Sequence, residues 1–295
     1  MNPDDQLLYE TRVRGRQTVA AAAAGVLLIV ASIVSLGGAH TKVNELTLDL
    51  LTANHRFPLD LIASVLTAVG SLAITWTLVF LFGCARARKP AIKPYIKIIT
   101  LIGGILSAVS GLVYAVIVAV KVHEFATTGD QTYQQANHLT GGAGLLALQL
   151  AGQLAALLVA VAFVLVSLQA MNTGLLSRFM GYLGMFAGAL FLFQITQVPV
   201  VQCYWLFALA YLISGRWPTG VPPAWRTGRA EIWPSSAEMR AQRLASRGGG
   251  GGGGGRRGAP APAAQAAGAG SIEDASGGPE RTRANTPKRK RKHRR

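Results

Sequence analysis

Long apolar segments are the feature that most constrains how this chain folds. Because an α-helix rises about 1.5 Å per residue, about 20 mainly apolar residues cross a hydrocarbon core about 30 Å thick. Segments 18–36, 59–82, 96–120 and 145–170 meet this requirement. Charged residues make up only 14% of the chain, against about a quarter in soluble domains. The sequence therefore predicts an all-α fold, a polytopic transmembrane helical bundle.

The stretch from residue 173 to residue 217 is too long for a single span. Thr196 and Gln197 form a polar break just before Pro199, which cannot donate a helical hydrogen bond. We expect two spans, over about 173–195 and 199–217, joined by a tight turn. A re-entrant hairpin over 179–213 is the alternative, since either form pairs its backbone groups inside the membrane.

Basic residues alternate between the predicted loops, and this alternation predicts the orientation. Loops on the cytoplasmic side of a membrane carry an excess of Lys and Arg. The basic connections contain Arg12, Arg14, Arg16, Arg86, Arg88, Lys89, Lys93 and Arg178, and the C-terminal tail is also basic. We therefore expect about six spans in the plasma (inner) membrane, with both termini cytoplasmic. Cleavage of the first span as a signal peptide is the alternative, because Gly37-Gly38-Ala39 resembles a cleavage site.

Composition divides the chain into four parts. A short cytoplasmic N-terminus (1–17) precedes the transmembrane helical domain (18–217). A membrane-proximal segment (218–247) and a Gly/Ala/Pro-rich basic tail (248–295) follow it. The tail opens with a run of glycine and is low in complexity, so we expect it to be disordered.

The membrane-proximal segment has two features typical of a membrane surface. Trp225 and Trp233 are expected at the level of the lipid headgroups, where tryptophan is enriched. Ser235 and Glu238 have the spacing of a helix-opening capping box. Arginines and apolar residues then alternate with a helical period, which predicts a short surface helix over 235–247.

The end of the chain is strongly basic. Residues 1–215 contain 12 Lys and Arg against 8 Asp and Glu, whereas residues 216–295 contain 17 against 5. Such a cluster is attracted to anionic lipid and, through counterion release, to RNA. The expected partners are therefore anionic lipids of the inner leaflet and a protein or ribosome; a solvated topology determinant with no partner is the alternative. The candidate contact residues are Lys288, Arg289, Lys290, Arg291, Lys292, Arg294 and Arg295.

Uncharged polar side chains repeat at helical spacing inside the apolar segments, while no charge lies at the centre of any span. Gln149 and Gln153 stand four residues apart, as do Ser71 and Thr75. Small and polar residues at this spacing allow helices to pack closely, which is the first interpretation. A solute route lined by these four residues is the second. Small residues share the same spacing in two other segments: Gly103, Ser107 and Gly111, and then Gly184 and Gly188.

Most of the histidines fall in loops predicted on the outer side, together with several carboxylates: His40, His55, His123 and His138. Imidazole and carboxylate groups are ligands of transition metals, and a membrane enzyme would need them in one site. No pair has helical i,i+4 spacing and no H-E-x-x-H motif occurs. We expect solvated histidines, with no metal and no cofactor. Cys84 and Cys203 are expected to be free core residues.

Sequence motifs of enzymes are missing. The sequence contains no G-x-x-x-x-G-K-[ST] phosphate loop and no G-x-S-x-G nucleophile motif. The glycine run follows no predicted strand and opens no helix, so it is not a nucleotide-binding loop. We therefore expect that the protein is not an enzyme.

Three sequence blocks, MNTGLLSRFMGYLGMFAGALF, QVPVVQCYWLFALAYLISGRWP and PPAWRTGRAEIWPSS, cover about residues 170–236. In these blocks the chain resembles multi-pass membrane proteins of actinobacteria that have no assigned activity. The resemblance implies an integral membrane protein and identifies no chemistry. The tail is similar to the tails of bacterial membrane insertases of the YidC type, but those have an arginine in a hydrophilic groove, and the predicted spans contain none.

Together these features predict a multi-pass plasma-membrane protein acting as a structural or interaction component through its basic cytoplasmic tail. The alternative is a small-solute transporter or channel with a route lined by Gln, Ser and Thr.

Overall fold

The computed structural model of the protein describes residues 3–36, 46–128, 131–193, 199–217, 221–231, 240–241 and 244–245. Within these residues the regular structure is helical. The chain divides into two compact units, Met1–Arg240 and Ala241–Arg295. All the helices named below belong to the first unit, which we call the body.

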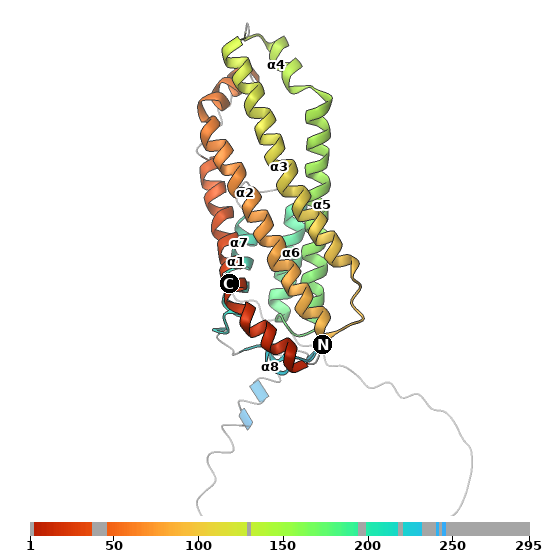
Figure 1. Cartoon of the computed structure of the whole chain (residues 1–295). Coiled ribbons are helices and arrows are strands. Elements are labelled where there is room, and N and C mark those ends of the chain that lie inside the picture. Colours follow the sequence, from red (N-terminus) through yellow and green to blue (C-terminus); the bar gives the residue numbers. More distant parts are fainter. Residues whose placement is uncertain are drawn as a thin grey trace, which may run out of the picture. The chain divides into compact units, whose positions relative to one another are not determined.

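Four long helices form the body: α1 (Pro3–Leu36), α2 (Leu46–Arg88), α3 (Tyr95–Thr128) and α5 (Ala143–Asn172). They run side by side, with α2 packed against α1 and α3, and α3 packed against α5 (Figure 1). Each is long and apolar enough to cross a membrane. The prediction of an all-α fold is therefore confirmed for the described residues, and four of the predicted spans lie in helices that could cross a membrane.

Helices extend beyond the predicted spans at the end of the body farthest from the N-terminus. The second predicted span starts at residue 59, whereas α2 starts at Leu46 and passes through Pro58 without interruption. Arg56 stabilises this extension, because its Nη2 donates to the Val34 carbonyl oxygen at 2.9 Å. A short helix, α4 (Tyr133–Thr140), lies at the same end, where the sequence predicts only a loop.

The stretch predicted as two spans forms two short helices, α6 (Arg178–Phe193) and α7 (Val200–Ile213). Their 16 and 14 residues rise about 24 and 21 Å, less than the thickness of a hydrocarbon core. α6 begins where α5 ends, packs along α5, and is followed by α7, which packs along α1. In Figure 1 both lie in the lower part of the body, while the long helices continue upward.

Glycines allow α6 to lie close to α5, as the G-x-x-x-G spacing predicts. A Cβ added at Gly184 would overlap the Ser167 hydroxyl oxygen of α5. A Cβ added at Gly188 would stand 2.7 Å from the Phe163 Cβ and 2.9 Å from the Ala160 carbonyl oxygen. Along this seam the backbone of α6 therefore lies directly against side chains of α5.

Large side chains fill the lower half of the body. Trp205 of α7 is fully buried, and its indole Nε1 donates to the Met180 carbonyl oxygen at 3.0 Å. Its ring lies 5.1 Å, centroid to centroid, from the ring of Phe163. The neighbouring fully buried side chains are Leu78, Leu81, Leu175, Leu206, Leu209 and Leu212.

The surface helix predicted over 235–247 and the tail over 248–295 lie outside the described residues, except for 240–241 and 244–245. The same is true of Trp233 and His40. These expectations stay predictions.

The α5–α6 seam gives the first testable prediction. Gly188→Ala should lower the thermal unfolding midpoint of the purified protein in detergent, because the added methyl group meets Phe163 and a backbone oxygen. Overpacking of this kind costs about 1–3 kcal/mol, or about 2–4 °C per kcal/mol in a domain of this size. Gly144→Ala is the control, since its Cβ meets nothing within 4 Å. Equal midpoints for the two variants would contradict the packing.

Candidate functional site

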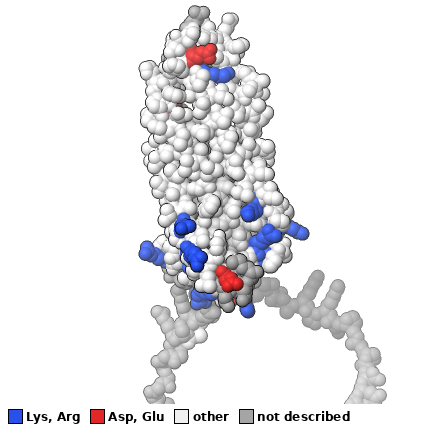
Figure 2. Space-filling model, viewed as in Figure 1, with Lys and Arg blue, Asp and Glu red and all other residues white. Residues whose placement is uncertain are grey.

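Lys and Arg gather at one end of the body, whereas the long middle of its surface carries almost no charge (Figure 2). We call this the basic end. It comprises the first turns of α1, the α2–α3 connection, the start of α6 and the end of α7. Its exposed cations include Arg12, Arg16, Arg86, Lys89, Lys93, Arg178 and Arg216.

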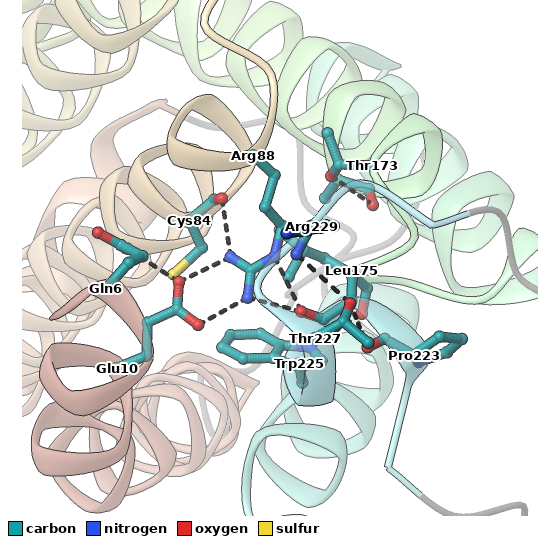
Figure 3. Close-up of polar contacts among 12 residues, drawn as sticks. Gln6, Glu10, Cys84, Arg88, Thr173, Leu175, Pro223, Trp225, Thr227 and Arg229 are labelled. Atoms are coloured by element: carbon teal, nitrogen blue, oxygen red, sulfur yellow. Dashed lines mark hydrogen bonds and ion pairs between the residues drawn. The ribbon is translucent and has the colours of Figure 1, made fainter. Parts of the chain in front are cut away.

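Arg88 also lies at this end, but its side chain is fully buried. It forms a bidentate ion pair with Glu10 of α1, with Nη1 to Oε1 at 2.6 Å and Nη2 to Oε2 at 2.7 Å (Figure 3). Nε and Nη2 also donate to the Ala224 carbonyl oxygen at 3.0 and 2.9 Å, and Nη1 donates to the Cys84 carbonyl oxygen. All five N–H donors of the guanidinium are therefore used.

Trp225 covers this ion pair from the side of α8 (Pro223–Thr227). The guanidinium carbons of Arg14 and Arg88 lie 5.0 and 5.3 Å from the centre of its ring, within cation–π distance. Its indole Nε1 donates to the Leu175 carbonyl oxygen at 3.1 Å, and Phe80 stacks on it. We call Glu10, Arg88 and Trp225 the arginine cluster.

The arginine cluster corrects two sequence predictions. The sequence predicts Arg88 in the loop after the second span, but it lies in the last turn of α2 and is buried, because Glu10 and two backbone carbonyl oxygens satisfy its charge and donors. Trp225 was expected at the lipid headgroups, but it is 4% exposed because it packs between Phe80 and the two arginines. Glu10 and Arg88 are 78 residues apart in the sequence, so no local pattern indicates that they pair.

The other half of the body contains a cavity of about 680 Å³, which we call the polar chamber. α1, α2, α3 and α5 form its walls, and Leu190, Phe191, Pro199 and Gln202 bring the end of α6 and the start of α7 to its lower end. No charged side chain among the described residues lines it. Its polar wall includes Ser71, Ser107, Ser110, Gln149, Gln153 and Gln202.

The structure brings three of the four predicted seam residues together. Ser71, Gln149 and Gln153 line the polar chamber. Thr75 instead lies buried, where its Oγ1 donates to the Ser71 carbonyl oxygen at 2.7 Å and fills the space beside Gly104. Ser107, Ser110 and Gln202 are chamber residues that sequence reasoning did not assign to a site. For Ser107 the sequence predicts only a role in helix packing, because of its spacing from Gly103 and Gly111.

The hydroxyl groups of the chamber offer acceptor oxygens to a ligand. Ser32 donates its proton to the Leu28 carbonyl oxygen, and Thr67 donates to that of Ala63, so their lone pairs are left for another donor. The Ser110 hydroxyl is buried and has no hydrogen-bond partner in the described part of the chain. A buried hydroxyl without a partner is costly, and a bound ligand would satisfy it.

A smaller cavity of about 270 Å³ adjoins the chamber and shares Ser35, Thr67 and Ser107 with it. This pocket also reaches Asp60, whose carboxylate lies 3.5 Å from the Arg56 guanidinium. The Asp60 carboxylate of the adjoining pocket is therefore held in an ion pair.

Metal ligands do not gather in the described residues. No group of three or more His, Cys, Asp or Glu side chains there could hold a metal ion. Cys84 and Cys203 are both buried and free.

No known protein family, curated protein or solved structure matches the chain. The chemistry of the chamber and of the arginine cluster therefore has to be interpreted from their own residues.

The buried ion pair gives the second prediction. Glu10→Ala should destabilise the protein by about 3–5 kcal/mol, because it leaves the Arg88 charge buried without a partner. Replacing both residues by methionine should recover most of this loss, since apolar pairs often substitute for buried ion pairs. Thermal unfolding in detergent measures both changes.

Arg86→Ala is the matched control, because Arg86 lies two residues from Arg88 in the same helix and is exposed. A loss as large for Arg86→Ala as for Glu10→Ala would contradict a special role for the ion pair.

Proposed function

We propose that the protein is a multi-pass plasma-membrane protein that binds a small neutral solute in the polar chamber. The observation that carries this proposal is an uncharged cavity of about 680 Å³, lined by amide and hydroxyl groups within a bundle of apolar helices. Polar groups at membrane depth are costly unless they pair, and they commonly mark substrate pathways. The role we propose is binding, without catalysis.

The basic end supports an orientation for this protein. Loops rich in Lys and Arg face the cytoplasm, so we propose that the basic end, with the start of α1, lies on the cytoplasmic side. The cytoplasmic C-terminus stays a prediction from the sequence. The polar chamber then lies in the outer half of the membrane. A solute would enter it from outside the cell or from the outer leaflet.

We also propose that α6 and α7 form a re-entrant hairpin, which replaces the fifth and sixth of the expected spans. Both helices are shorter than the hydrocarbon core, and the hairpin begins and ends at the basic end. Phe191 near the end of α6 and Pro199 before α7 line the chamber together with Gln153 and Ala156, midway along α5.

The walls of the chamber define the class of solute. The absence of a charged group from its described lining disfavours an ion, because an ion would enter without a counter-charge. Leu28, Ile74 and Phe191 add apolar surface, while the glutamines and serines offer hydrogen bonds. We therefore propose a neutral molecule with hydroxyl or amide groups on an apolar frame.

Side chains fill the lower half of the body, which favours binding of the solute over its free passage through the protein. Trp205, Phe163 and the leucines around them form a continuous buried core there. Transport through this protein would require the hairpin to move away from α5. The interaction role expected for the basic tail rests on residues outside the described part of the chain, and it stays a separate prediction.

A depth measurement tests the hairpin. Nitroxide spin labels at Leu192, Leu157 and Leu146 would all lie on exposed positions of the body. We expect the label at Leu192, near the end of α6, to have the bilayer depth of the label at Leu157, in the middle of α5. A depth equal to that of Leu146, in the first turns of α5, would show a complete span and contradict the hairpin.

A bound-ligand measurement tests the function. The protein, extracted in mild detergent, should carry a neutral small molecule that mass spectrometry detects after denaturation. The double variant Gln149→Leu and Gln153→Leu should retain about tenfold less, because a pair of lost hydrogen bonds contributes on the order of 1.4 kcal/mol. Gln134→Leu is the control, since Gln134 is an exposed glutamine in α4. Equal retention by the two variants would contradict a solute site in the chamber.

A further inference from the structure

A second cavity lies at the basic end, separate from the polar chamber. It is a groove of about 530 Å³ between the first half of α1 and the second half of α2, and it reaches Lys97 of α3. The residues that line the groove change from apolar to basic along its length. Trp76 and Val79 lie deeper in the apolar part of α2, whereas Arg86 lies near the end of that helix.

This gradient matches the shape of a phospholipid. Ten residues separate Trp76 from Arg86, which is about 15 Å along a helix, or half the thickness of a hydrocarbon core. Trp76 is 65% exposed, so one wall of the groove offers a bare indole ring to the hydrocarbon. A charged group beside Arg86 and an acyl chain along Trp76 would then follow the same groove.

The charges of the groove favour an anion. Arg86 and Lys97 both line it and are exposed, and they come from different helices. No carboxylate among the described residues lines it. Glu10, on the neighbouring turn of α1, is already paired with the Arg88 guanidinium through both of its oxygens. The two cations of the groove are therefore available to a phosphate.

A buried glutamine supplies an independent indication of a ligand. Gln17 lines the groove and is 3% exposed, and its Oε1 has no hydrogen-bond partner in the described part of the chain. Gln6, which also lines the groove, differs because its Nε2 donates to Glu10 at 2.9 Å. An unpaired amide oxygen is an acceptor, so it favours a ligand that carries a hydroxyl donor.

From these observations we infer that the groove binds one anionic phospholipid whose headgroup carries hydroxyl groups, as in phosphatidylglycerol. Arg86 and Lys97 contact the phosphate, a headgroup hydroxyl donates to Gln17, and an acyl chain lies against Trp76 and Val79. This is a built site on the body, unlike the diffuse attraction expected of the basic tail. It does not depend on the solute proposed for the chamber.

The test is native mass spectrometry of the full chain in detergent with added phosphatidylglycerol, phosphatidylmethanol or phosphatidylcholine. We expect one tightly retained phosphatidylglycerol and little phosphatidylcholine. Arg86→Gln with Lys97→Gln should weaken phosphatidylglycerol binding about 30-fold, from the usual contribution of two basic residues at a lipid surface. Phosphatidylmethanol has the same charge but no headgroup hydroxyl, so it should bind more weakly than phosphatidylglycerol.

Lys89→Gln with Lys93→Gln is the matched control, because it removes the same charge from exposed positions of the basic end that do not line the groove. Equal weakening by the two double variants would show diffuse surface attraction and overturn the site. Equal retention of phosphatidylcholine would overturn the anionic ligand. Equal binding of phosphatidylmethanol and phosphatidylglycerol would overturn the contact between the hydroxyl and Gln17.

Discussion

Helix length is the constraint from which the rest of this structure follows. The four long helices have 30 residues or more, whereas α6 and α7 have 16 and 14. Six helices therefore pack in the lower half of the body, and four continue beyond the described ends of α6 and α7. The polar chamber lies between these four helices. Ser, Thr and Gln are tolerated on its walls because they face the cavity and one another.

The lower half of the body has the opposite character. There the short helices bring Trp205 and Met180 into a continuous core with α2 and α5. The arginine cluster closes this half at the basic end, because the Arg88 guanidinium binds α1 through Glu10 and α8 through the Ala224 carbonyl oxygen. Burying a charge is costly, and here a bidentate carboxylate and two carbonyl oxygens offset the cost. The cluster therefore joins α1 and α8, the first and last labelled helices of the body, which are far apart in the sequence.

The polar chamber and the groove at the basic end are related through α2. Ser71 lines the chamber, and Trp76 and Arg86 line the groove, so one helix presents residues to both cavities. Thr75, between Ser71 and Trp76 in the sequence, is buried against Gly104 of α3 and lines neither cavity. The chamber is uncharged and the groove is cationic, so the two cavities would select different ligands. A neutral solute and an anionic lipid would not compete.

The sequence by itself determined the fold class of the protein, the positions of its long helices and one close contact between helices. Long apolar segments predict the four spans, and the spacing of Gly184 and Gly188 predicts the close contact of α6 with α5, because these signals are local and periodic. The same local reasoning selected Ser71, Gln149 and Gln153, since residues four apart share a helix face. It also selected Thr75, because periodicity does not indicate which neighbouring helix a face meets.

Only the tertiary structure decided which helix faces meet. The pairing of Glu10 with Arg88 and the burial of Trp225 join residues far apart in the sequence, and a run of basic residues looks the same whether its members are solvated or paired. Ser110 and Gln202 lie in different helices, so neither one indicates a cavity until α3 and α7 are placed. The physical reason is that hydropathy and spacing describe one helix at a time, whereas a cavity or a buried ion pair depends on several helices in contact.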